Sequence, residues 1–164
     1  MGGIDMNQQT LAKWLKIIIG GSAICGLAIY FYFFPYYGQS LITENPDYSL
    51  YYWPWLIFLW ITAVPCYTVL YFSWEIAVEI SKDNSFSIKN ALLLKSISQL
   101  AVLDSVIILA GNILFLIINI NHPGIILLSL IIIFIGIALA VTTAALSHLV
   151  LKAAAIRLEN ELTI

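Results

Sequence analysis

Asp104 is the residue whose type and position most directly suggest chemistry. It is the one acid well inside a long apolar run, and Asn112 shares its helical face. A charged Asp at mid-bilayer costs roughly 2.5–3.5 kcal/mol on insertion scales, so we expect it to be protonated, paired or turned inward. We predict His148 as its partner, because the two lie at similar depths in their apolar runs. Such a pair would relay protons or sense pH, or would only fix helix packing through a hydrogen bond.

Other residue types that commonly serve catalysis are scattered. Cys25 and Cys66 lie inside separate apolar runs, so we expect neither a structural disulfide nor an activated thiolate. The sequence contains no nucleophile elbow, no phosphate-binding glycine loop and no spaced set of metal ligands. We therefore expect no enzymatic activity, no cofactor and no metal.

The composition identifies the solvent in which these side chains must act. Of 164 residues, 62% are hydrophobic and 10% are charged, whereas an ordinary soluble domain has about 45–50% and about 25%. So few charges cannot cover a soluble globule, and lipid must surround much of the chain. The formal net charge of −2, with no basic stripe, argues against direct nucleic-acid binding.

Four apolar runs are long enough to cross a bilayer core of about 30 Å as helices. They cover residues 15–37, 53–74, 97–118 and 125–151. The polar stretches between and after them predict outer loops at 38–52 and 119–124, an inner loop at 75–96 and an inner tail at 152–164. We predict that Pro123 and Gly124 reverse the chain between the last two spans. The fold class is therefore an all-α integral membrane four-helix bundle, forming one domain over residues 1–164.

The positive charges predict how this bundle is oriented. Lys and Arg near span ends are retained in the cytoplasm, and all seven fall on one face of a four-span chain: Lys13, Lys16, Lys82, Lys89, Lys95, Lys152 and Arg157. Both termini are thus predicted inside, with helix extensions on that side. The outer face carries Glu44, Asp47 and His122. Aromatic residues bracket its longer loop and predict either an anchoring belt or a ligand-facing cup: Tyr36, Tyr37, Tyr48, Tyr51, Tyr52, Trp53 and Trp55.

Two features predict how the helices pack. Gly136, Ala140 and Ala144 recur every four residues, and small residues let two helices approach closely in lipid. This stripe is a contact face within the chain or, alternatively, a face for homo-oligomers. Pro65 removes a backbone hydrogen bond in the middle of its span, so we expect a kink there.

The inner loop and the tail contain the most distinctive polar sequence. Asn84, Ser85 or Ser87 can cap a helix that enters the third span. The run FSIKNALLLKSIS, residues 86–98, and the ending LENELTI, residues 158–164, resemble the bacterial family called domain of unknown function 2975. That resemblance implies a small four-span protein of the bacterial cytoplasmic membrane, often encoded beside a small helix-turn-helix transcription regulator. The candidate partner-binding residues are Phe86, Ser87, Asn90, Glu159, Asn160, Glu161, Leu162 and Thr163.

These observations lead to one leading hypothesis and two alternatives. We expect a regulatory or sensory membrane protein that binds a cytosolic partner through the inner loop and tail. In the first alternative it is a small transporter or channel subunit that uses Asp104, Asn112 and His148 within an oligomer. In the second it protects against a membrane-active peptide through its outer aromatic loop.

Overall fold

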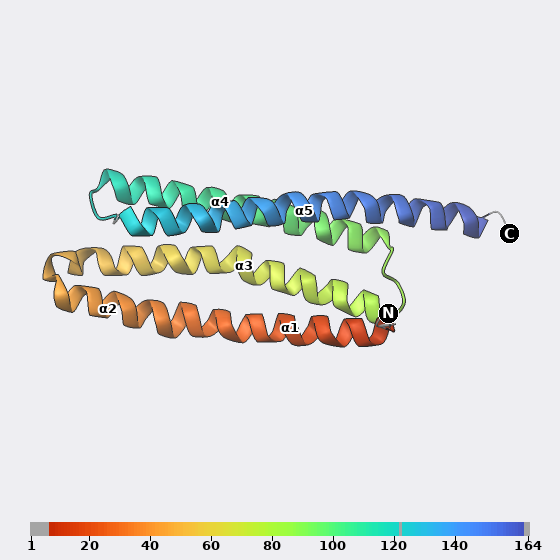
Figure 1. Cartoon of the computed structure of the whole chain (residues 1–164), viewed down its shortest axis with the longest axis horizontal. Coiled ribbons are helices and arrows are strands. Elements are labelled where there is room, and N and C mark those ends of the chain that lie inside the picture. Colours follow the sequence, from red (N-terminus) through yellow and green to blue (C-terminus); the bar gives the residue numbers. More distant parts are fainter. Residues whose placement is uncertain (1–6, 122, 163–164) are drawn as a thin grey trace, which may run out of the picture.

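The computed structural model describes residues 7–121 and 123–162 and is all-helical over them. Its elements are α1 (Gln8–Ala28), the π-helix η1 (Ile29–Phe33), α2 (Phe34–Glu44), the 3-10 helix η2 (Pro46–Tyr51), α3 (Tyr52–Ser81), α4 (Ile88–Ile117) and α5 (Pro123–Leu162). Because α1, η1 and α2 follow one another without a break, these elements make four rods (Figure 1). Each rod is long and apolar enough to cross a membrane, which confirms the prediction of four spans.

The loop predicted over residues 38–52 is much shorter in the structure. Most of the stretch 38–52 is helical, because α2 continues to Glu44 and η2 begins after a single residue, Asn45. Polar residues there do not end the helix, and Thr43 Oγ1 donates a hydrogen bond back to the carbonyl of Gln39 at 3.0 Å. The helix ends where Pro46 disfavours helical backbone angles for the residue before it. Accordingly, Asn45 has φ −137° and ψ 85°.

The other two connections are also shorter than predicted. Helix α3 runs on to Ser81 and α4 starts at Ile88, which reduces the predicted inner loop of 75–96 to residues 82–87. The turn between α4 and α5 uses Asn119 with φ 59°, a left-handed conformation that Asn tolerates well. Pro123 is the first residue of α5 rather than part of the reversal, in keeping with the preference of proline for the first helical turn.

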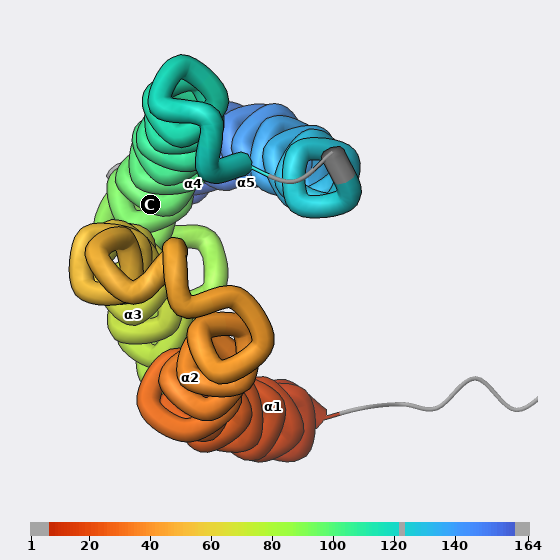
Figure 2. Tube along the Cα trace, turned by 90° about the vertical axis from the view of Figure 1, so that its left-hand side faces the viewer, coloured from red at the N-terminus to blue at the C-terminus, as the bar shows by residue number. Residues whose placement is uncertain are grey.

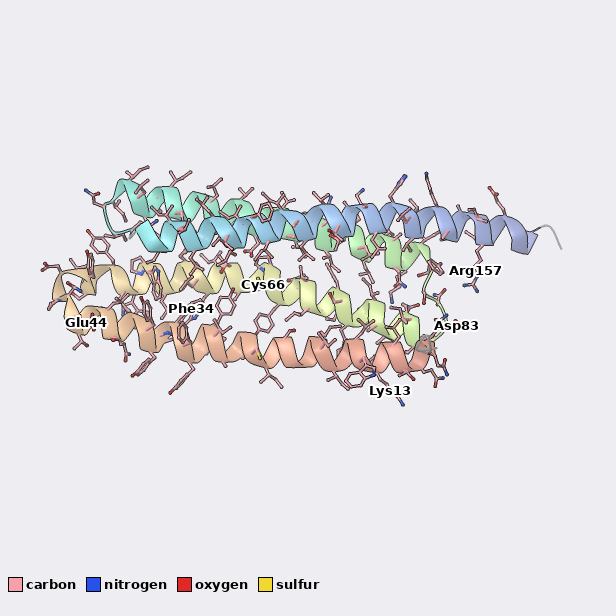
Figure 3. The ribbon with its side chains drawn as sticks, viewed as in Figure 1. Lys13, Phe34, Glu44, Cys66, Asp83 and Arg157 are labelled. Carbon is pink, nitrogen blue, oxygen red and sulfur yellow. The ribbon has the colours of Figure 1, made fainter. Side chains whose placement is uncertain are left out.

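Pro65 bends α3 without interrupting it. The residue lies inside a helix that is continuous from Tyr52 to Ser81. Figure 3 places Cys66, the next residue, where the axis of α3 changes direction. A proline ring clashes with the carbonyl four residues earlier and removes one hydrogen bond, so the helix axis tilts at that point. The predicted kink is therefore present.

The four rods form an open arc, visible end-on in Figure 2. Helix α1 packs on α3, α3 packs on α4, and α4 packs on α5. A closed bundle would also bring α1 against α5, and the described residues make no such contact. Two helical hairpins, one of α1 to α3 and one of α4 and α5, thus meet through the single α3–α4 contact.

Small residues and hydroxyl groups hold α4 against α5. Along one face of α5, buried or half-buried residues recur at alternating intervals of four and three: Ser129, Ile133, Gly136, Ala140, Thr143, Ser147, Val150 and Ala154. Ser98 Oγ donates to the carbonyl of Ala140 at 2.8 Å, and Ser147 Oγ donates to that of Ala91 at 2.7 Å. An average spacing of 3.5 residues keeps one face in contact along two gently supercoiled helices.

This spacing corrects one member of the predicted stripe. Gly136 and Ala140 lie in the seam, but Ala144 is exposed and Thr143 takes the next seam position. A stripe repeated every four residues rotates away from the contact, because the helix has 3.6 residues per turn. The stripe therefore serves contact within the chain.

Gly136→Leu should destabilise the chain, because a Cβ at Gly136 would lie 2.5 Å from Ser105 Oγ. Overpacking of this kind costs about 1–3 kcal/mol, so we expect a lower melting temperature in detergent micelles. Gly20→Leu is the matched control, since a Cβ at Gly20 meets nothing within 4 Å. Equal melting temperatures for the two variants would contradict the close approach of α4 and α5.

Candidate functional site

Asp104 faces α3 and is paired with a cysteine. Cys66 Sγ donates to Asp104 Oδ2 at 3.4 Å, across the contact between the two hairpins. The second carboxyl oxygen, Oδ1, is buried and has no hydrogen-bond partner. Asp104 itself is half-buried. The expectation that this acid turns toward the interior is therefore met, with Cys66 as its partner.

The contact continues to the first span through Tyr30. The Tyr30 hydroxyl donates to Cys66 Sγ at 3.9 Å and lies 3.4 Å from Thr62 Oγ1. Thr62 in turn donates to the carbonyl of Leu59 at 2.8 Å. Tyr30, Thr62, Cys66 and Asp104, which we call the polar link, thus connect η1, α3 and α4. Polar side chains in lipid associate in this way because hydrocarbon offers them no other hydrogen bonds.

A π-helical turn positions Tyr30. Pro35 lacks an N–H and its ring clashes with the carbonyl four residues earlier, which widens the helix over Ile29–Phe33. Trp60 Nε1 on α3 donates to the carbonyl of Tyr30 at 3.2 Å. The sequence signal for this feature is a proline after a run of aromatics, and our sequence reading missed it.

His148 lies far from Asp104, contrary to the predicted pairing. It is exposed on α5, next to Ser147, whose hydroxyl bonds the carbonyl of Ala91. Ala91 and Asp104 are 13 residues apart on α4, or about 20 Å at 1.5 Å per residue. The depth estimate was wrong because it measured both residues from the ends of their apolar runs, and those ends are not level. Ser147 lies opposite Ala91, and Ser98 lies opposite Ala140.

Asn112 supports the turn between α4 and α5 and does not contact Asp104. Its Nδ2 donates to the carbonyl of Ile108 at 2.8 Å. Asn121 Nδ2 donates to Asn112 Oδ1 at 3.1 Å and to its carbonyl at 3.2 Å. Asp104, Asn112 and His148 therefore lie at three separate levels.

We call the end of the molecule that lies opposite Glu44 the basic end. Two of the predicted partner-binding residues have structural roles there. Ser87 caps α4, because its side chain accepts from the backbone N–H of Asn90 at 3.2 Å. Asn90 is 1% exposed, and its Nδ2 donates to the carbonyls of Asn84 and Ser85. Asn90 is therefore too buried to contact a partner, whereas Ser87 is half-buried and stays a candidate. Phe86 is 56% exposed and stays a candidate.

Lys89 neutralises two acids that share one face of α3. Its ammonium lies 3.0 Å from Glu75 Oε2 and 3.1 Å from Glu79 Oε1. Glu79 also accepts from Asn84 Nδ2 at 2.9 Å. These contacts join the end of α3 to the start of α4 and close the loop of residues 82–87. Figure 3 shows Lys13, Asp83 and Arg157 at this same end, opposite Glu44.

The last helix projects beyond the others at the basic end (Figure 1). Ala154 is buried, and residues 155–159, which follow it, are all exposed. Ile156 and Leu158 are 59% and 47% exposed. Of the predicted tail residues, Glu159 is exposed and Asn160, Glu161 and Leu162 continue the helix. Thr163 lies outside the described residues.

A pocket of about 460 Å³ opens at the end that carries Glu44, which we call the tyrosine end. Both hairpins line it, because α2, η2 and α3 provide one side and the α4–α5 turn and the start of α5 the other. Its aromatic lining is Tyr37, Tyr48, Tyr51, Tyr52 and Trp55, and its carboxamides are Asn45, Asn119 and Asn121. Five of the seven aromatic residues for which the sequence predicted either an anchoring belt or a ligand-facing cup therefore line this hollow.

Gly38 allows this tyrosine pocket to form. It is buried, and a Cβ there would lie 2.8 Å from Tyr52 Cε2 and 3.0 Å from Trp55 Cζ3. The Tyr52 hydroxyl donates to the carbonyl of Pro35 at 3.4 Å. The rings therefore rest on the backbone of α2. No group of three or more potential metal ligands occurs among the described residues.

The sequence of these elements matches a known family. The model of the family described as protein of unknown function (DUF2975) matches residues 37–164. The chain belongs to the DUF2975 family. In this DUF2975 protein, the matched residues contain the whole lining of the tyrosine pocket, with Cys66 and Asp104, whereas Tyr30 precedes them. No curated protein and no solved structure matches the chain.

Cys66→Ala and Asp104→Ala should be energetically coupled, because each removes one partner of the same hydrogen bond. We expect a coupling free energy of about 0.5–1.5 kcal/mol, the range found for hydrogen bonds between membrane helices. Unfolding of the two single variants and the double variant in mixed micelles measures it. The control pair is Cys25→Ala with Asp104→Ala, since Cys25 is exposed on α1. Equal coupling in both pairs would contradict the polar link.

Asn90→Ala should loosen the loop of residues 82–87, because the buried carboxamide holds two loop carbonyls. A buried group left without its partner costs about 1–3 kcal/mol. We expect faster amide hydrogen exchange at residues 82–87 and a lower free energy of unfolding. Gln99→Ala, which changes an exposed carboxamide on the same helix, should leave both unchanged. Unaltered exchange in the Asn90 variant would rule out this role.

Proposed function

We propose that this protein is a membrane sensor that receives a signal at the tyrosine pocket and passes it to a cytosolic partner on the projecting end of α5. One observation carries the proposal: α5 is a single uninterrupted helix of 40 residues. Ile125 near its start lines the pocket, and Ile156 and Leu158 lie exposed near its other end. A displacement of the helix at the pocket therefore also moves the projecting end.

The charges and the exposed residues support a cytosolic partner at the basic end. Lys and Arg near span ends favour the cytoplasmic side, and no Lys or Arg lies between Lys16 and Lys82 or between Lys95 and Lys152. Ile156 and Leu158 follow Lys152, the charged residue that ends the long apolar run, so we expect water rather than lipid around them. Exposed apolar residues on such a helix suit a groove on another protein. The family resemblance suggests a small helix-turn-helix regulator as that protein.

The connection between the hairpins supports a sensor rather than a passive anchor. A ligand in the pocket touches both hairpins, which otherwise meet through the α3–α4 contact. The Cys66–Asp104 pair of the polar link lies in that contact, where Asp104 has one oxygen without a hydrogen-bond partner. Rearranging this contact costs less free energy than rearranging a fully hydrogen-bonded one, because fewer hydrogen bonds must be broken. The pocket can therefore bias how the hairpins pack.

The double variant Ile156→Ser and Leu158→Ser tests the docking surface. Both residues are exposed, so the fold should survive, and we expect at least a tenfold loss of a small helix-turn-helix regulator that co-purifies with the parent chain. Mass spectrometry of proteins recovered from solubilised membranes measures this loss. Ala155→Ser, an exposed change in the same turn, should leave recovery unchanged. Equal recovery with all three chains would exclude α5 as the docking surface, and recovery of no such regulator with the parent would exclude this partner class.

The alternatives of transport and peptide immunity stay predictions. The three polar residues that suggested transport lie at separate levels along the helices. The tyrosines that suggested immunity line the pocket, where they serve a sensor equally well.

A further inference from the structure

We propose that the tyrosine pocket binds an organic ammonium ion. The proposed purpose of this binding, which is to carry a signal, rests on the sensor hypothesis. The binding itself does not, because it needs no cytosolic partner. The volume of about 460 Å³ falls within the range of about 300–1,000 Å³ that is usual for small-ligand sites. The hollow is thus large enough for a small molecule and too small for a folded partner.

The lining favours a cation with an apolar body. Four tyrosines and one tryptophan contribute aromatic rings, whose faces carry partial negative charge and attract ammonium groups. Among the residues that the structure describes, no Lys, Arg, Asp or Glu lines the pocket. A small metal ion would require several oxygen ligands in a tight shell, whereas rings spread over a wide hollow suit a bulky, weakly hydrated cation.

The charge distribution of the chain points the same way. Glu44 and Asp47 are immediate sequence neighbours of the lining residues Asn45 and Tyr48, and both acids are exposed. Every Lys and Arg lies near the start of α1, in or near the loop between α3 and α4, or in the last part of α5, and these segments form the basic end. The potential around the pocket is therefore negative, which attracts cations and repels anions. His122, in the same turn, lies outside the described residues.

Two pocket tyrosines are well suited to carry the test. Tyr52 contacts Gly38 and the carbonyl of Pro35, so its removal would disturb the fold. Tyr48 and Tyr51 are 47% and 37% exposed and lie on η2. Their rings can be removed by Leu and retained by Phe. Tyr36 provides a matched control, because it is a 68% exposed neighbour of Tyr37 that does not line the pocket.

Choline and 3,3-dimethylbutan-1-ol, its uncharged isostere, are the probes. Calorimetric titration of the purified full chain in phosphatidylglycerol nanodiscs should show binding of choline and weaker binding of the isostere. Tyr51→Leu and Tyr48→Leu should each weaken choline binding roughly two- to thirtyfold, the range of a cation–π contact. Tyr51→Phe, Tyr48→Phe and Tyr36→Leu should leave it within about twofold.

A second arm distinguishes a free ligand from a lipid headgroup. If the natural ligand is a headgroup, phosphatidylcholine in the nanodiscs should compete with choline and reduce its apparent affinity. If it is a free solute, adding phosphatidylcholine at a constant fraction of phosphatidylglycerol, which holds the surface charge fixed, should leave the affinity unchanged. Both results support the ammonium site and differ only in the source of the ion.

Other outcomes would overturn the proposal. Equal affinity for choline and its isostere would mean that the pocket selects shape and not charge. Absence of choline binding, or an equal loss with Tyr36→Leu, would remove the site. None of these results would affect the docking of a partner on Ile156 and Leu158, so the two proposals fail separately.

Discussion

Helices in hydrocarbon gain little by burying leucine against one another, because lipid tails are equally apolar. They associate where backbones approach closely or where polar groups bond across the gap. Each helix contact in this protein shows one of these solutions. Gly136 and Ala140 bring α5 against α4, Ser98 and Ser147 reach across to backbone carbonyls, and the polar link joins α3 to both of its neighbours.

The unequal strength of these contacts explains the open arc. The α4–α5 seam is continuous over seven turns, from residue 129 to residue 154, and is made of small residues and serines. The α3–α4 contact has fewer such features, among them Cys66 with Asp104 and the ring of Phe58 against Gly111. No comparable seam draws α1 toward α5. Two hairpins joined along one line can change their relative angle more easily than four helices closed into a ring.

The two ends of the molecule use different physics. At the basic end Lys89, Glu75 and Glu79 form ion pairs and Asn90 holds the loop carbonyls, so that end is held together by polar contacts. At the tyrosine end rings rest on the backbone of Gly38 and leave a hollow. A closed end with a projecting helix and an open end with a pocket make the molecule asymmetric along its length, which suits the sensor role that we propose.

The sequence by itself determined the features that depend on local chemistry. Apolar length established four spans, Ser87 was among the residues expected to cap α4, and Pro65 predicted the bend in α3. Loop lengths were overestimated, because polar residues such as Gln39 and Thr43 are compatible with a helix that leaves the membrane. The partner of Asp104 was decided only by the tertiary structure. Almost every face of these helices is apolar, so no pattern of polarity reveals which face meets which neighbour, and the register between α3, α4 and α5 follows from the close packing of small residues.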